Sequence, residues 1–405
     1  MLSWEYPPQL VGGLGRHVHA LATALTAAGD EVTVVTRSAP GALREEYTEG
    51  VRVIRAPDDP RAGPPGEDLL AWALALNHAL TRAALHAVRS SPGGFDVVHA
   101  HDWLVAHAAM TVRDHLGVPL VATVHATERG RHQGFLPEEQ NRTIDGIERW
   151  LTAEAAHVIV CSGYMREEVI RHFWVPADRV EVVHNGVDSL RWRARPRAVA
   201  AARERYAEPG APLISCAGRL VYEKGVQYLL RAFPGLREHR PGLRLVIAGE
   251  GPYRRELEAI ATPGVTFAGF LHGHALTALM AASDCYLVPS LYEPFGMVAL
   301  EAAAAGTPVA AADTGGLAEI VEHGVTGVKF PPADPDGLAW ETGAVLDDRD
   351  GARELARAAR VRARDDFNWP AIAARTAHVY AVALRSAGAG WEGYAREAVC
   401  TESAV

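Results

Sequence analysis

The sequence has little cysteine, no long hydrophobic run and no excess of positive charge. Its four cysteines are scattered among 405 residues, and three of them lie within or beside apolar, strand-like segments. This placement favours small core residues in a reducing cytoplasm over disulfides or metal ligation. No apolar segment of the sequence reaches the length of a membrane span. The net charge of −9, with both signs interspersed, argues against binding to nucleic acid.

A complete dinucleotide-binding motif is also missing. Gly249-Glu-Gly251 resembles half of such a motif, but the third glycine and the acid that would bind a ribose after it are absent. This absence argues against an NAD-dependent oxidoreductase.

What the sequence does contain is a regular alternation of predicted strands and helices. A first series of strands is expected at 31–36, 51–54, 95–101, 119–125, 158–161 and 180–183. A second series is expected at 213–217, 243–248, 265–268, 285–289 and 309–312. Such alternation indicates parallel, doubly wound sheets. We therefore predict two similar α/β domains with a ligand bound between them, near the carboxyl ends of the strands.

The limits of these domains follow from composition. The break is expected near the Asn185-Gly186 turn and the polar, arginine-rich segment 191–205. Residues 1–8 have the pattern of a strand that ends in a loop, so roughly three to six further apolar residues are expected upstream. The expected parts are an N-terminal domain at 1–187, a C-terminal domain at 188–368, a final helix at 369–386 and a poorly ordered tail at 387–405.

Two glutamates follow the strand expected at 285–289. Glu293 lies in the turn after this strand, and Glu301 lies two turns along the next helix. The helix N-terminus between them offers free N–H groups to an anion. Carboxylates for hydroxyls and N–H groups for a diphosphate predict a site for a nucleotide sugar. A surface turn with a charge near a helix N-terminus is the simpler alternative.

Two cations follow the first strand of the second series. Arg219 and Lys224 precede a helix that begins near Gly225, and cations beside a helix N-terminus can bind a diphosphate. Either cation alone is also typical of a solvated loop. Their combination with Glu293 argues against a non-catalytic glycan-binding protein, which would not need all three.

Histidines end two strands of the first series. His99 and His101 alternate on one strand, and His125 ends the next. Alternate residues of a strand point to the same side, which suggests a metal site. A clear third ligand is missing from the sequence, so we expect no obligatory metal. Asp102, which follows His101, has the simpler interpretation of a helix cap.

Together, these segments resemble glycosyltransferase family 4, whose members have the GT-B fold. The family's E-x7-E spacing matches Glu293 and Glu301. Within the family, the sequence is most similar to actinobacterial-type glycogen or α-glucan synthases, over nearly its full length. The resemblance implies two Rossmann-like domains facing across a cleft and a C-terminal helix that crosses back to the first domain. The family's loops are matched at 218–225, 249–252, 269–273, 293–306 and 314–319, and the glucan synthases' segments at 3–8, 12–19, 99–107 and 126–132.

The resemblance also implies a role for each site residue. Four are expected to be catalytic: Lys224 and Arg219 at the diphosphate, Glu293 at the donor sugar, and His125 near the reacting centre. His101 and Asp102 are expected to line the acceptor side. Residues expected to bind the donor are Gly12, Gly13, Gly15, Gly249, Gly251, Phe270, Leu271, Phe295, Gly296, Met297, Val298 and, at the ribose, Glu301.

The activity implied is a retaining transfer of a hexose, expected to be glucose, from ADP-glucose or UDP-glucose to an α-1,4-glucan in the cytoplasm. The family's proposed route is front-face attack with the donor phosphate as base, so Glu293 would position the sugar. No cofactor is expected. The alternatives that remain open are a small-molecule or lipid acceptor, and a sugar-nucleotide epimerase on the same fold. The nucleobase and the oligomeric state are left open.

Overall fold

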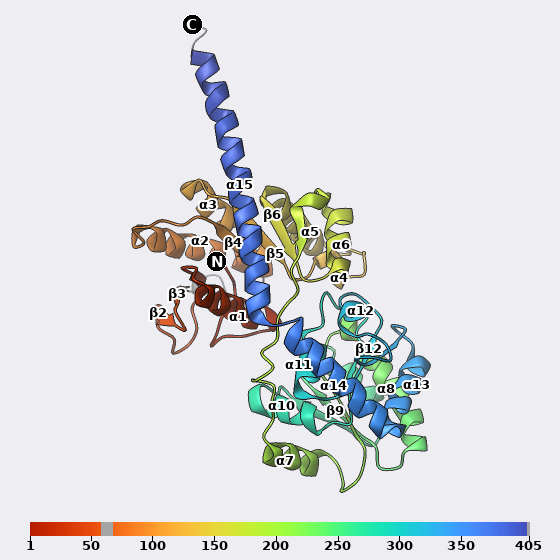
Figure 1. Cartoon of the computed structure of the whole chain (residues 1–405). Coiled ribbons are helices and arrows are strands. Elements are labelled where there is room, and N and C mark those ends of the chain that lie inside the picture. Colours follow the sequence, from red (N-terminus) through yellow and green to blue (C-terminus); the bar gives the residue numbers. More distant parts are fainter. Residues whose placement is uncertain (58–67, 403–405) are drawn as a thin grey trace. The chain divides into compact units, whose positions relative to one another are not determined.

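The computed structural model describes residues 1–57 and 68–402, which form two compact units (Figure 1). Unit 1 contains Met1–His184 and the segment that begins at Trp369, and unit 2 contains Asn185–Asn368. The sequence placed the break after residue 187. Val187 falls in unit 2, where its N–H donates to the carbonyl of Phe367 at 2.8 Å. No described helix is both long and apolar enough to cross a membrane.

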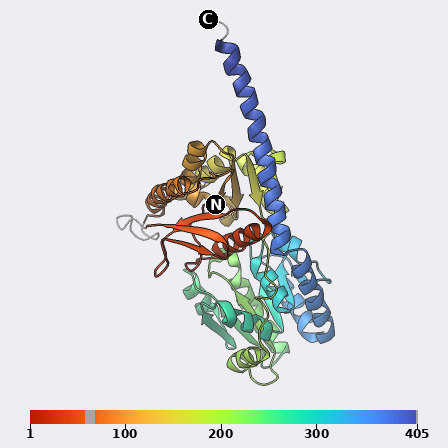
Figure 2. The same ribbon diagram turned by 60° about the vertical axis from the view of Figure 1, so that its left-hand side comes forward.

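The sheet of unit 1 is parallel except at one edge. Its order is β2-β3-β1, then the bridging residue Leu2, then β4-β5-β6-β7. Leu2 donates to His99 O at 2.8 Å and accepts from His101 N at 3.1 Å. Strand β2 is antiparallel to β3, and the two form the red to orange hairpin in Figure 2. The strands are β1 (Thr33–Arg37), β2 (Glu45–Thr48), β3 (Val51–Ala56), β4 (Val98–His101), β5 (Leu120–Val124), β6 (His157–Val160) and β7 (Val180–Val182).

Helices pack on both faces of this sheet, and its central strands β4 and β5 are buried throughout. The apolar face of α1 contributes Leu21 and Leu25 to a core that also includes Ile372 and Val379 of α15. Helix α1 ends at Gly29, whose φ of 109° suits only glycine well. The helices are α1 (Gly13–Ala28), α2 (Leu69–Arg89), α3 (Ala106–Leu116), α4 (Glu128–Arg131), α5 (Glu139–Glu154), α6 (Gly163–Phe173) and α15 (Trp369–Glu402).

Helix α15 returns the chain to unit 1 and is longer than the sequence suggested. We expected the helix to end at 386, whereas its assigned range runs to Glu402 (Figure 1). The poor order expected for the residues after 386 stays a prediction.

Unit 2 is built on a fully parallel six-stranded sheet in the order β10-β9-β8-β11-β12-β13. All five strands of the predicted second series are present, and the short β13 extends one edge. The strands are β8 (Leu213–Ala217), β9 (Arg244–Ala248), β10 (Val265–Gly269), β11 (Cys285–Val288), β12 (Val309–Ala312) and β13 (Val328–Phe330). The helices are α7 (Pro196–Tyr206), α8 (Val226–His239), α9 (Arg254–Ile260), α10 (Gly273–Ala282), α11 (Met297–Ala305), α12 (Leu317–Ile320), α13 (Pro335–Asp347) and α14 (Arg349–Asp365).

Helix α7 occupies part of the segment whose composition suggested a boundary between domains. Its Arg203 donates to the carbonyl of Ala282 at 2.6 Å and to that of Ala211 at 2.7 Å, and forms an ion pair with Asp284 at 2.8 Å. The arginine therefore attaches α7 to the start of β11. Composition alone cannot distinguish an arginine that faces solvent from one that joins two elements, so the segment was interpreted as a boundary.

Candidate active site

The carboxylate of Glu293 lies just beyond the carboxyl end of β11 and is 8% exposed. Its Oε2 accepts from Lys224 Nζ at 2.8 Å and from Ser290 Oγ at 3.1 Å. Lys224 arrives from the loop after β8, which neighbours β11 in the sheet. The structure thus brings together the lysine and glutamate that the sequence assigned to neighbouring parts of a donor. Sequence reasoning did not identify Ser290, although it lies only three residues before Glu293 in the chain.

Close backbone contacts hold Glu293 in this position. The N–H of Gly316 donates to the carbonyl of Glu293 at 2.9 Å, and the carbonyl of Glu223 accepts from Leu291 N at 2.8 Å. A Cβ on Gly315 would lie 2.1 Å from the carbonyl oxygen of Glu293, so only glycine allows this approach. The loops after β8, β11 and β12 therefore fix one another around the carboxylate.

The N-terminus of α11 lies between the two glutamates. Gly296, at φ 109°, is its N-cap residue, and neither a side-chain cap nor an acidic residue is found in the first turn. Phe295, just before it, is buried with its ring 6.0 Å from that of Phe367. Met297 and Val298 begin the helix and are half-buried. Uncapped N–H groups and the helix dipole make this turn suited to an anion.

The other predicted donor residues of unit 2 are more dispersed. Glu301 is buried on α11. Arg219 is exposed and forms no ion pair with any described residue. Phe270 is 66% exposed after β10, whereas Leu271 packs against a core cluster. Among the predicted donor residues of unit 2, Arg219 and Phe270 are therefore the ones exposed to solvent.

Gly249 and Gly251 have a structural reason to be glycine. A Cβ on Gly249 would lie 1.8 Å from the carbonyl oxygen of Gly218, and one on Gly251 would lie 2.2 Å from that of Leu220. Both glycines let the loops after β8 and β9 touch. This contact fixes the loop that presents Arg219.

In unit 1, the glycine loop wraps around the carboxylate of Glu5, which sequence reasoning did not select. Glu5 Oε2 accepts from Val11 N at 2.5 Å and from Gly12 N at 3.1 Å. A Cβ on Gly15 would lie 2.6 Å from Leu10 Cδ2 and 3.1 Å from Glu5 Cγ. Two of the N–H groups in the loop expected to approach a phosphate are thus already bonded to an anion, and α1 begins directly after them, at Gly13.

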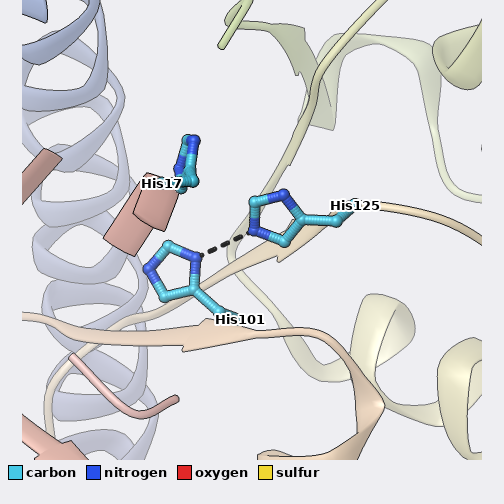
Figure 3. A group of neighbouring side chains, drawn as sticks. All are labelled: His17, His101 and His125. Atoms are coloured by element: carbon cyan, nitrogen blue, oxygen red, sulfur yellow. Dashed lines mark hydrogen bonds between the residues drawn. The ribbon is translucent and has the colours of Figure 1, made fainter. Parts of the chain in front are cut away.

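The histidines at the ends of β4 and β5 are joined by a third from α1. Nδ1 of His101 and Nε2 of His125 are 3.2 Å apart, and Figure 3 shows the ring of His17 beside them. The ligand nitrogens of all three lie within 4.8 Å of one another. The third histidine beside this pair, which the sequence did not identify, is therefore His17. The sequence did contain a sign of this position. His17 follows Leu14 by three residues and precedes Leu21 by four, which places it with Val18 on the apolar face of α1.

Burial determines the charge of this cluster. It lowers the pKa of His99 and of His101 well below the usual value and lowers that of His125 to about 4, so the rings are neutral at pH 7. Burial also raises the pKa of Asp102 to about 6. Asp102 does not cap the following turn; its Oδ1 accepts instead from His125 N at 2.7 Å. The structure therefore places His101, Asp102 and His125 next to one another, as the sequence led us to expect.

A network of hydrogen bonds and ion pairs supports the loop after His125. Both carboxylate oxygens of Glu148 accept from Glu128 N, at 3.0 and 2.9 Å. Arg129 forms a two-pronged ion pair with Asp145, at 3.0 and 3.1 Å. These contacts attach α4 to α5 and leave the loop little freedom.

Similarity to known proteins agrees with this geometry. Residues 11–191 match the family described as Glycosyltransferase Family 4, and residues 200–362 match Glycosyl transferases group 1. A glycogen synthase of Mycobacterium tuberculosis is 44% identical over 402 residues, covering 95% of this chain and 94% of that protein. A D-inositol 3-phosphate glycosyltransferase of Xylanimonas cellulosilytica is 36% identical over 396 residues, covering 92% of each.

Solved structures give the same answer for the fold. Sucrose-phosphate synthase from Thermosynechococcus elongatus is similar with a TM-score of 0.80 and 28% identity, covering 95% of this chain and 98% of that chain. The expected fold and enzyme class are confirmed. The chain belongs to glycosyltransferase family 4: it is a hexosyltransferase of the GT-B fold and resembles glycogen synthases.

Proposed function

We propose that this enzyme transfers glucose from ADP-glucose or UDP-glucose to a hydroxyl of an α-1,4-glucan, with retention of anomeric configuration, in the cytoplasm. The observation that carries the proposal is the 44% identity to a glycogen synthase along nearly the whole chain. The ion pair and the uncapped helix N-terminus described for unit 2 supply chemistry that suits this reaction.

On the donor side, the charge of the leaving diphosphate is stabilised by Lys224, Arg219 and the N-terminus of α11. An ammonium group has three donors, so Lys224 can keep its bond to Glu293 and still donate to a phosphate. Both described bonds to Glu293 go to Oε2, so we assign Oε1 to a hydroxyl of the sugar.

The bonds made by Glu293 favour a positioning role over a nucleophilic one. A carboxylate that accepts from an ammonium and a hydroxyl is a weaker nucleophile than a free one. We therefore propose attack from the front face with the donor phosphate as base. Neutral His125 then hydrogen-bonds the sugar, with His101 and Asp102 beside the acceptor. The transfer itself needs no metal ion.

The remaining donor contacts are assigned as the family resemblance implies. Glu301 binds the ribose, and the backbone at Phe270 and Leu271 lies along the nucleobase. Gly12, Gly13 and Gly15 shape the loop near the phosphate, with Glu5 holding two of the loop's N–H groups. A phosphate would therefore meet this loop at groups other than the two bonded to Glu5.

A second acceptor class is supported by one observation, the 36% identity to a D-inositol 3-phosphate glycosyltransferase. That similarity favours transfer to a small phosphorylated polyol. The epimerase alternative has no such support.

The test combines donors and acceptors with the purified full chain. ADP-glucose, UDP-glucose and a GDP-hexose are each incubated with glycogen, maltose or D-inositol 3-phosphate, and released nucleoside diphosphate and product are measured. We expect nucleotide release with a glucose donor and glucan elongation in α-1,4 linkage, with no loss of rate in EDTA. Transfer only to the inositol phosphate would replace the glucan proposal. If no donor releases its nucleotide or raises the Tm, the function itself is refuted.

A further inference from the structure

The three histidines of unit 1 lie together although they come from three separate elements. His17 is on α1, His101 ends β4 and His125 follows β5 (Figure 3). The ring centroids of His17 and His125 are 4.7 Å apart, and those of His101 and His125 are 5.5 Å apart. His17 and His101 are buried and His125 is half-buried.

The spacing of the ring nitrogens suits one transition-metal ion. Zinc binds histidine nitrogen at about 2.0–2.1 Å, so two ligands of a tetrahedral ion are roughly 3.3–3.4 Å apart. Nδ1 of His101 and Nε2 of His125 already lie 3.2 Å apart. The nitrogen of His17 completes a group within 4.8 Å, and a shift of its ring closes the remaining gap.

The hydrogen bonds of neighbouring groups show which side chains could be ligands of the ion. His99 stacks on His101, with ring centroids 4.2 Å apart, but both of its nitrogens are engaged. They lie 2.7 Å from Tyr380 Oη and 2.6 Å from Thr123 Oγ1. Asp102 accepts from His125 N and so fixes the backbone of a ligand rather than serving as one. Three imidazoles remain, and the fourth position of the ion would be left to water.

The two nitrogens of His101 have different surroundings. Nε2 of His101 is buried and forms no hydrogen bond with any described group. Nδ1 lies 3.2 Å from Nε2 of His125 and is therefore the nitrogen that can share an ion with His125 and His17. Imidazole is a preferred ligand of zinc, copper, nickel and cobalt, and coordination at Nδ1 leaves Nε2 of the same ring as it is.

We propose that His17, His101 and His125 form a site for one Zn²⁺-like transition-metal ion, and that loading it inhibits the enzyme. The inhibitory part rests on the proposed function, in which His125 hydrogen-bonds the sugar. An ion bound to Nε2 of His125 would hold that ring toward His101 and withdraw the nitrogen from substrate.

Binding is tested first, without substrate. The untagged full chain, freed of metal with EDTA and desalted, is titrated with Zn²⁺ by calorimetry and with Co²⁺ by visible absorption. We expect one tight equivalent, a rise of a few degrees in Tm, and the intense absorption of four-coordinate Co²⁺ bound by nitrogen. H17Q should lose all three signals, because two imidazoles then remain. H107Q is the matched control, since His107 is a partly exposed histidine on α3 outside the cluster.

Inhibition is tested second, in the transferase assay with and without Zn²⁺. Saturation should reduce the rate of the wild type and of H107Q to below about a tenth, and EDTA should restore it. H17Q should keep its rate in the same Zn²⁺ concentration. If transfer is absent under all conditions, the inhibition proposal falls with the proposed function while the binding result stands.

Several results would overturn the metal site. They are weak binding of several ions by the wild type, the weak absorption of six-coordinate Co²⁺, or equal binding by H17Q. Should H17Q fail to fold, H17N and the wild-type Co²⁺ spectrum decide the question, because the spectrum alone distinguishes four nitrogen or oxygen ligands from six.

Discussion

At the scale of single residues, the pair Lys224–Glu293 concentrates opposite charges at the carboxyl edge of unit 2. Glu293 is buried and Lys224 is partly exposed, with 2.8 Å between Nζ and Oε2. The lysine therefore has two roles. It stabilises the fold by neutralising the charge of a buried carboxylate, and in the proposed reaction it binds a phosphate of the donor. Substitutions should affect stability and turnover together.

We predict that Lys224→Ala lowers turnover by about a hundredfold or more, because it removes charge stabilisation at the leaving group. It should also reduce the free energy of unfolding by about 1–3 kcal/mol, because Glu293 loses its counter-ion. The stability effects of Lys224→Ala and Glu293→Ala should couple in a double-mutant cycle by about 0.5–3 kcal/mol. The measurements are steady-state kinetics and urea unfolding.

The control for this pair is Lys329→Ala. Lys329 forms an ion pair of the same length, 2.8 Å, with Asp313, which is about half exposed. Exposed pairs contribute about 0–1 kcal/mol, so both stability and turnover should change little. Equal effects of the two substitutions would contradict the special role of Lys224.

The buried carboxyl of Glu148 gives a prediction about pH. Burial raises the pKa of Glu148 well above its usual value. The folded state therefore binds this proton more tightly than the unfolded state, so the group's contribution to stability is full at low pH and is lost as pH rises through the folded pKa. Glu148→Gln imitates the protonated form, so its Tm relative to the wild type should increase from pH 5 to pH 9. A constant difference in melting scans across that range would show that Glu148 does not titrate in this way.

At the scale of elements, the site depends on loops that approach one another through glycine. Gly225 lies between η3 (Tyr222–Lys224) and α8, with φ of 69°, and a Cβ there would lie 1.8 Å from the carbonyl oxygen of Pro289. Gly210 has a similar φ of 80°, but a Cβ there would meet no atom within 4 Å. The two positions separate the cost of backbone conformation from the cost of a collision.

We predict that Gly210→Ala costs about 1–2 kcal/mol of unfolding free energy, the ordinary penalty of a left-handed backbone. Gly225→Ala should cost more than about 3 kcal/mol, because the loops after β8 and β11 must also separate. It should lower turnover as well, since Lys224 precedes it. Urea unfolding and the transferase assay check both variants, and equal costs would mean that the loops yield easily.

The elements also show what the sequence could and could not predict. Long apolar runs identified β8, β9 and β11, because strands covered on both faces need apolar residues throughout. The polar strand β2 and the arginine-rich helix α7 were not predicted, because neither has a strong hydrophobic pattern. In the candidate site, Glu293 and Lys224 were found from motifs. Glu5 was missed because its bonds to Val11 and Gly12 depend on how the loop folds back, and His17 was missed because His101 and His125 are distant in sequence.

At the scale of the whole molecule, the order of the chain makes the two units unequal. Unit 2 is one continuous stretch, Asn185–Asn368, whereas unit 1 needs residues from both ends of the sequence. Helix α15 buries Ile372, Ala373, Val379 and Ala383 in the core formed with α1. Its Tyr380 also lies 2.7 Å from Nδ1 of His99, so the helix reaches the buried histidines.

We therefore predict that residues 185–368 fold alone, whereas residues 1–184 do not. Without α15, the fragment 1–184 would expose the apolar face of α1, including Leu21 and Leu25, and should aggregate or lack a cooperative melting transition. Adding a peptide of residues 369–386 should restore cooperative melting, and the same peptide with Ile372 and Val379 changed to aspartate should not. Circular dichroism and size-exclusion chromatography make the comparison. A fragment 1–184 that melts cooperatively without the peptide would show that α15 is an addition to unit 1 rather than part of its core.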